Sequence, residues 1–333
     1  TVGGDSFIDI RLDLKNRFDS GFAVNDLIES DSDISINDAQ ISDSGFIAVS
    51  FRVKLRYNNA GLDLDATKIF NLITIFNMSD ILNGRSGSKY VDDYSFYVME
   101  ESGSRQQKSS SGYNISFSDQ DVYFDRRESQ FGQVWKLSNS DNYSNATRVI
   151  NFADTSDALN YINFPNSQYI NEVNKRAAFG VPIKIFNDYY SDGKIMFVGA
   201  QLFDPFVLNT LSAPHTPNPI GAVYIYKQAV EETEWTYFGA TYGKGYTSEN
   251  ISANLSEYSG SQISNKQYGL FGYDFDYKDG NLLVSEPGGN GNNELNVPRA
   301  YLFQIQNSIT LLETYVASNI SLPNSHTISA GDE

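Results

Sequence analysis

A pattern that occurs twice in the C-terminal half of the chain constrains the fold more than any other sequence feature. Each copy begins with a Phe-Gly dipeptide, passes through an Asp-Gly turn into an apolar strand, and resumes after a loop with an aromatic-rich strand. The corresponding segments are Phe179-Gly180, Asp192-Gly193, 194–200 and 221–226 in the first copy and Phe271-Gly272, Asp279-Gly280, 281–287 and 299–305 in the second. The two copies predict two similar antiparallel β units.

The spacing of the copies indicates the size of the unit. The two Phe-Gly dipeptides are 92 residues apart. This spacing equals two units of 46 residues, and 46 residues is close to the length of one four-stranded propeller blade, which has about 40–50 residues. Residues 235–240 are predicted to close the first unit, and a third copy is expected from Gly112 through residues 122–124 to residues 133–137. Two hairpins of a β-sandwich are the alternative interpretation of the same pattern.

Two segments near the N-terminus alternate between apolar and polar side chains. They run from Ile8 to Leu14 and from Ile47 to Tyr57. A period of two residues places one set of side chains on a buried face of a sheet and the other set in water. We therefore predict an all-β chain, with an N-terminal β-sandwich or jelly-roll-like domain followed by a small β-propeller-like domain.

The charge and the residue content of the chain argue against several classes of function. The 333 residues include 41 acidic and 24 basic side chains, which give a net charge of −17, and no cysteine. Because phosphate binding needs clustered Lys and Arg, neither nucleic acid nor anionic lipid is expected as a partner. The lack of cysteine excludes disulfides and thiolate zinc sites. Neither a signal peptide nor direct membrane insertion is expected.

The repeated segments resemble FG-GAP-type β-propeller repeats. The resemblance rests on the Phe-Gly starts, on the buried strands that end in Val198-Gly199-Ala200 or Val284-Ser285-Glu286-Pro287, and on the strand at residues 221–226. It extends over residues 175–315. It implies a complete or partial propeller, a fold used mostly for adhesion and recognition, although a fold alone does not define a function.

The chain as a whole is similar to the vertex spike proteins of corticoviruses, which are marine, tailless, membrane-containing phages. The similarity lies in length, acidity, lack of cysteine and a two-part plan. It implies an anchoring domain at residues 1–140, in contact with capsid vertex proteins, and a recognition domain at residues 141–333. The implied function is attachment of the virion, through a homo-oligomeric spike, to a host cell-surface receptor, for which a glycan is one candidate.

FG-GAP repeats of the integrin type also carry a calcium-binding loop, which here falls on the Asp-Gly turns. Asp188 and Asp192 match two ligand positions in the first copy, and Asp276 and Asp279 are the candidate ligands in the second. Calcium takes six to eight oxygen ligands, but Tyr190 and Met196 stand where the first loop needs its other side-chain oxygens, and Phe275 stands where the second loop needs its first Asp. Calcium is the candidate ion, a plain Asp-Gly hairpin is the alternative, and no organic cofactor is expected.

Catalysis is not expected from the sequence. His215 and His326 are the only histidines, and the chain has no nucleophile elbow, phosphate loop or dinucleotide fingerprint. The runner-up function is a bacterial surface or secreted adhesin or lectin with the same repeats. A propeller glycosidase comes third, because the paired carboxylates of glycoside hydrolysis are defined in three dimensions and not by sequence spacing.

The long segments between strands are the predicted receptor-binding regions. Residues 201–220 combine aromatic side chains with four prolines, and residues 240–270 hold tyrosines among Gly, Ser and Asn. Such a composition is typical of recognition loops, because Tyr offers contact area and a hydroxyl at low entropic cost. The candidate receptor-binding residues are Tyr242, Tyr246, Tyr258, Phe206 and His215.

Overall fold

The computed structural model consists of β-strands joined by turns. The residues it describes are 26–27, 34–57, 67–78, 94–100, 113–126, 132–152, 179–201, 203, 221–243, 246–247, 270–287 and 298–316. Every complete element among them is a strand, except the 3-10 turn η3 (Asn139–Asp141). The predicted all-β class is confirmed, whereas the predicted strand at residues 8–14 lies outside the described residues.

The first antiparallel sheet contains the N-terminal strands. Its hydrogen-bonded order is β1-β3-β4-β5, and β2 also pairs with β3. The strands are β1 (Asp26–Leu27), β2 (Ile34–Ile41), β3 (Phe46–Tyr57), β4 (Thr67–Asn77) and β5 (Tyr94–Glu100). β3 coincides with the second alternating segment, so the period of two residues predicted this strand correctly.

Three further sheets follow, and in each of them every strand pairs with the next strand along the chain. The second sheet consists of β6 (Ile115–Ser118), β7 (Asp121–Arg126), β8 (Gln133–Leu137) and β9 (Ala146–Asn151). The third consists of β10 (Phe179–Asn187), β11 (Lys194–Ala200), β12 (Ala222–Gln228), β13 (Thr236–Tyr242) and β14 (Tyr246–Thr247). The fourth consists of β15 (Phe275–Lys278), β16 (Asn281–Glu286), β17 (Arg299–Ile305) and β18 (Ile309–Val316).

The repeated sequence pattern corresponds to these sheets. The two clear copies form the third and fourth sheets, and the predicted third copy forms the second sheet. β13 is the closing strand expected near residues 235–240. The fourth strands of the other two units, β9 and β18, were not predicted, because neither has a counterpart among the repeated motifs.

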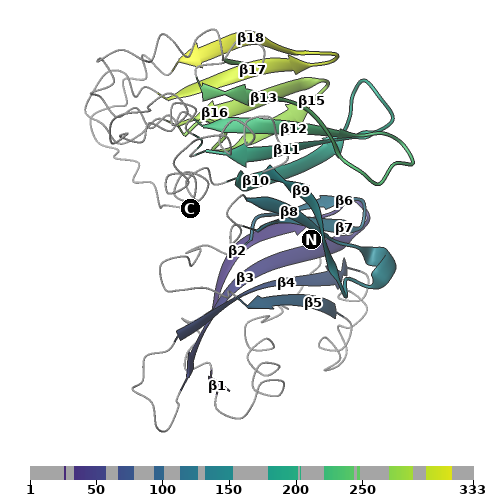
Figure 1. The fold of residues 1–333 in the computed structure, drawn as a ribbon, viewed down its shortest axis with the longest axis vertical. Helices are drawn as coiled ribbons and strands as arrows, with labels where there is room; N and C mark the ends of the chain where they lie inside the picture. The colour runs from purple at the N-terminus through teal and green to yellow at the C-terminus, as the bar shows by residue number, and fades with distance from the viewer. Residues whose placement is uncertain are drawn as a thin grey trace, which may run out of the picture.

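The four sheets are stacked in chain order (Figure 1). One apolar core lies between the first and second sheets, another between the second and third, and another between the third and fourth. β11 contributes to two of these cores, because Met196 faces the second sheet and Phe197 faces the fourth. This explains its continuous apolar sequence, which is typical of a strand that is buried on both faces. No described sheet closes on itself.

The predicted domain boundary at residue 140 falls inside the second sheet. Residue 140 lies in η3, between β8 and β9, and these two strands are hydrogen-bonded neighbours. The structure therefore does not separate the chain at this position. A cut there would remove the outer strand of a sheet whose core side chains contact both neighbouring sheets.

The Phe-Gly dipeptides lie where consecutive sheets meet. The Phe179 ring packs 5.1 Å from the Phe152 ring of the preceding segment, and Phe271 pairs across the sheet interface with Gly221. A Cβ atom at Gly132 would lie 2.7 Å from the carbonyl oxygen of Phe179, and one at Gly221 would clash with the carbonyl oxygen of Phe271. The backbone of Phe179 therefore needs a glycine just before β8, and the backbone of Phe271 needs one just before β12. In both cases this strand is the third strand of the preceding sheet.

This close approach predicts a large effect of Gly221→Ala on stability. The new Cβ would clash with the Phe271 backbone, and a φ of +82° is unfavourable for alanine. We expect the free energy of unfolding to decrease by about 2–4 kcal/mol in urea titrations. Gly45→Ala is the matched control, because Gly45 has a φ of +83° and nothing within 4 Å of the added Cβ. It should lose only about 1 kcal/mol; equal losses for the two variants would contradict the close approach.

Candidate functional site

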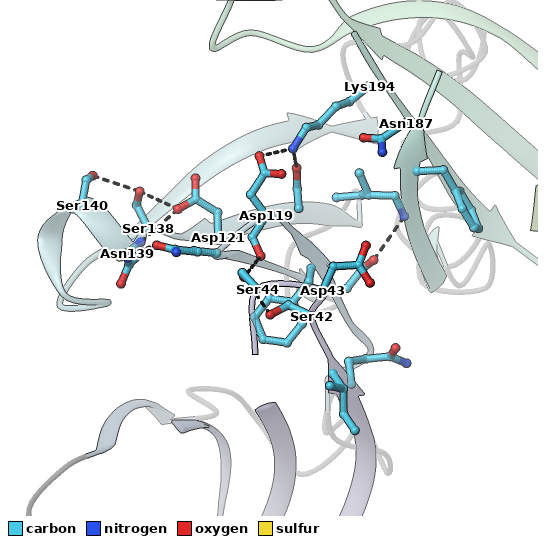
Figure 2. A pocket seen from close by; sticks show the side chains of 18 residues that line it. Ser42, Asp43, Ser44, Asp119, Asp121, Ser138, Asn139, Ser140, Asn187 and Lys194 are labelled. Atoms are coloured by element: carbon cyan, nitrogen blue, oxygen red, sulfur yellow. Dashed lines mark hydrogen bonds and ion pairs between the residues drawn. The ribbon is translucent and has the colours of Figure 1, made fainter. Parts of the chain in front are cut away.

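Turns of the first and second sheets and strand ends of the third sheet meet around one polar pocket (Figure 2). Its volume is ≈ 1020 Å³. The walls come from the β2–β3 turn, the β6–β7 hairpin, the start of the β8–β9 connection and the adjoining ends of β10 and β11. The lining residues are 40–44, 116–121, 138–140, 185–187 and 194.

Hydrogen bonds between the turns hold the pocket walls together. The Ser44 hydroxyl of the first sheet donates to the Asp119 carbonyl of the second at 2.9 Å. Lys194 of the third sheet donates to the Ser118 hydroxyl at 2.8 Å and forms an ion pair with the Asp119 carboxylate. The Ile185 amide donates to the Ser116 hydroxyl at 3.1 Å. Hydrogen bonds and an ion pair thus connect all three sheets at the pocket.

Serine and aspartate side chains also shape the individual turns. The Ser42 hydroxyl accepts the Phe46 amide at 2.9 Å and so closes the β2–β3 turn. Asp121 accepts hydrogen bonds from the Ser138 hydroxyl and the Asn139 amide, each at 2.9 Å, at the start of η3. Short polar side chains favour turns because they satisfy backbone groups that have no partner in a strand ladder.

The pocket carries more negative than positive charge. Among the described residues that line it, Asp43, Asp119 and Asp121 are acidic and Lys194 is basic. Asp121 is also 3.4 Å from Lys136, so part of this negative charge is neutralised locally. Nearby, burial and the Asp121 carboxylate raise the pKa of Tyr143 to about 12. The protonated Tyr143 hydroxyl donates to the Gln120 carbonyl at 2.8 Å.

The pocket lining offers both hydrogen-bond donors and acceptors. Serine hydroxyls and the amides of Gln40, Gln120, Asn139 and Asn187 can donate and accept, whereas the carboxylates accept only. Partly exposed Phe117 and Phe186 add apolar surface. Such a mixture suits a polar, largely uncharged ligand that needs several orienting hydrogen bonds.

Of the predicted receptor-binding residues, only Tyr242 has a side chain within the described part of the structure, and it does not line this pocket. Tyr242 is only 1% exposed and packs in the core against Phe203, with ring centroids 5.7 Å apart, so its side chain does not present a surface to a receptor. Tyr246 lies in the short strand β14, and its side chain is outside the described residues. Tyr258, Phe206 and His215 also lie outside them.

The predicted calcium ligands are distributed over two sheets. Asp188 and Asp192 lie in the β10–β11 connection, and Asp276 and Asp279 lie on β15 and in the turn after it. Within the described residues, no group of three or more His, Asp or Glu side chains is arranged to hold a metal ion. The calcium hypothesis stays a prediction, which a calcium titration of the melting temperature tests.

Asp188 is the centre of a buried hydrogen-bond cluster. Its Oδ2 atom lies 3.0 Å from Lys227 Nζ and accepts the Ser191 hydroxyl at 2.9 Å. Its Oδ1 atom accepts the Tyr190 amide at 3.3 Å and the Tyr277 hydroxyl at 3.4 Å. Burial by itself raises the pKa of Asp188, but the hydrogen bonds from Lys227, Ser191 and the Tyr190 amide outweigh it and lower the pKa below its ordinary value of 3.8.

This cluster predicts a pH-dependent effect of Lys227→Met. At pH 7 the variant leaves a charged carboxylate buried, so we expect the free energy of unfolding to decrease by about 1–3 kcal/mol. Because the folded state lowers the pKa of Asp188, its stabilisation is complete above pH 3.8 and is lost as the pH falls through the lower folded-state value. The difference between variant and wild type should therefore shrink in acid.

Urea titrations at several pH values measure this effect. The double variant Lys227→Met with Asp188→Asn is the matched control, because it removes the buried charge together with its partner. It should recover part of the lost stability at pH 7. If Lys227→Met unfolds at the wild-type urea concentration at pH 7, the ion pair does not stabilise the fold.

Sequence reasoning missed the pocket residues, although a signal for them exists. Three of the lining segments have similar short sequences: Ser42-Asp43-Ser44, Ser118-Asp119-Gln120 and Ser138-Asn139-Ser140. Each segment was compatible with an ordinary turn, and only the stacking of the sheets brings the three together. A search for repeated serine-rich turns would have selected these positions.

No protein-family model matches the sequence, and the search of curated proteins gives no match either. Within the part of the chain that the structure describes, no helix is long and apolar enough to span a membrane.

Proposed function

We propose that this protein is an attachment protein, which binds a ligand on the surface of a host cell in the polar pocket at the hairpin turns. The observation that carries the proposal is that turns of the first and second sheets and strand ends of the third line one pocket, and that Ser44, Lys194 and Asp119 tie these three sheets together there. Rigid strands that present short polar turns are a common way to build a recognition surface, because the scaffold fixes the contacting groups before binding.

The proposed setting is the surface of a virion. The sequence resemblance to corticovirus vertex spikes supports it, as does the similarity of the repeats to FG-GAP propeller units. In this arrangement the last three sheets are blades of a propeller-like recognition domain. The N-terminal β domain anchors a homo-oligomeric spike to the capsid vertex proteins. A bacterial adhesin with the same repeats is the alternative setting, and it shares the binding function.

Binding of the purified full chain to a panel of intact marine bacteria tests the proposal. We expect saturable binding to some strains, and Asp43→Arg should weaken it on the order of tenfold, because it places bulk and positive charge in the pocket. Glu232→Arg is the matched control. Glu232 is an exposed residue of the β12–β13 connection that does not line the pocket, and its variant should bind like wild type.

The outcome of the same assay separates the two settings. If the protein is a spike, preincubation of the bound strain with the chain should reduce infection by a marine membrane-containing phage of that strain. Binding without any such reduction would favour the adhesin. If no strain binds the wild-type chain, or if Asp43→Arg and Glu232→Arg bind equally well, attachment through this pocket is excluded.

A further inference from the structure

Two consecutive aromatic side chains project from the connection between β10 and β11. Tyr189 is 60% exposed and Tyr190 is 39% exposed. Their rings meet edge to face, with centroids 5.0 Å apart and an interplanar angle of 89°. Single exposed aromatic residues are common on protein surfaces, but this pair also has a fixed backbone and a fixed inner ring.

The backbone of the pair is held by the buried cluster around Asp188. Asp188 is 5% exposed and accepts the Tyr190 amide at 3.3 Å. The Tyr189 amide donates to the Tyr277 hydroxyl at 3.3 Å. Lys227, which neutralises Asp188, also donates to the Gln306 carbonyl of the fourth sheet at 3.2 Å. The connection is therefore tied to two sheets, although its aromatic side chains face solvent.

The inner ring of the pair is fixed by the fourth sheet. The Tyr190 ring covers Gly280 so closely that a Cβ atom there would lie 2.5 Å from Tyr190 Cε2. Gln304 donates to the Tyr190 hydroxyl at 3.3 Å. Tyr189 in turn packs against this fixed ring and keeps most of its own surface free. A preorganised exposed ring binds a flat apolar surface with little loss of conformational entropy.

The pair adjoins the polar pocket along the chain. Asn187 and Lys194, at the two ends of the connection, both line the pocket, and Tyr189 follows Asn187 by two residues. The Tyr190 ring rests against Gly280 and Gln304 of the fourth sheet, so a ligand reaches this aromatic surface only if it extends from the pocket across the β10–β11 connection. One part of such a ligand would contact the hydroxyl, amide and carboxylate groups of the pocket, and another part would contact the Tyr189 ring.

We propose that Tyr189, supported by Tyr190, is an aromatic subsite beside the pocket that stacks against a sugar ring, and that the ligand is an oligosaccharide. A sugar combines hydroxyl groups around its edge with an apolar C–H face, which matches a polar pocket followed by an exposed ring. The balance of donors and acceptors in the pocket fits a neutral polyhydroxylated ligand. This proposal rests on the attachment function proposed above, and it specifies the chemical class of the receptor.

Chemical treatment of cells that bind the full chain tests the ligand class. Periodate cleaves vicinal diols of surface glycans, whereas protease removes surface proteins. We expect periodate to reduce binding at least tenfold and protease to leave it within twofold. The reverse result would overturn the sugar as ligand, because a protein receptor would then be responsible. The attachment function itself would stand in that case.

Variants at Tyr189 test the subsite with the same cells. Tyr189→Ala should raise the half-saturating concentration roughly 3- to 10-fold, as expected for the loss of one stacking contact. Tyr189→Trp keeps an aromatic face and should stay within threefold of wild type. Tyr273→Ala is the matched control, because Tyr273 is 57% exposed but lies before β15 and does not line the pocket. All variants should melt within about 2 °C of wild type, since Tyr189 is largely exposed.

Each result at Tyr189 decides the proposal. If Tyr189→Ala binds as tightly as wild type, the subsite is excluded while attachment stands. If Tyr273→Ala weakens binding as much as Tyr189→Ala, exposed aromatic surface matters in general and this pair has no special role. Loss of binding in both Tyr189→Ala and Tyr189→Trp would contradict stacking as the mechanism.

Discussion

The stack of sheets depends on the contact between a glycine of one sheet and the phenylalanine that begins the next. At Gly221 the backbone of Phe271 comes so close that no side chain fits between them, and Gly132 has the same relation to Phe179. This contact brings the backbones of the second and third sheets, and those of the third and fourth sheets, close together. The apolar side chains of each interface, including the central strand β11, then fill the space that the contact defines.

Register between sheets determines where their turns lie. Because each sheet from the second to the fourth follows the same strand order, a fixed register brings their hairpin turns close together. Lys194 links the turn of the third sheet to Asp119 of the second, and Lys227 links the third sheet to Gln306 of the fourth. The pocket and the adjoining tyrosine pair thus follow from the same packing that stabilises the chain.

The fold was more predictable from the sequence than the candidate site. The alternation in β3 and the repeated motifs are local patterns, and they predicted strands in all four sheets. Tyr242 shows where prediction from composition fails. Its segment is rich in Tyr, Gly and Ser, which predicted a loop, but Tyr242 is the last residue of β13 and its side chain is buried in the core. Asp188 and Lys227 are 39 residues apart, and Ser44 meets Asp119 across two sheets. Such contacts require tertiary structure, so neither cluster was predicted.

Hydrogen–deuterium exchange of the full chain, with and without polysaccharide extracted from cells that bind it, tests the central claim most directly. The claim is that ligand binding takes place at the hairpin turns where the sheets meet. It predicts slower exchange in residues 42–45, 118–121, 138–140 and 187–194 when ligand is bound, with little change in the inner strands. Protection confined to other segments, with these four unchanged, would contradict it.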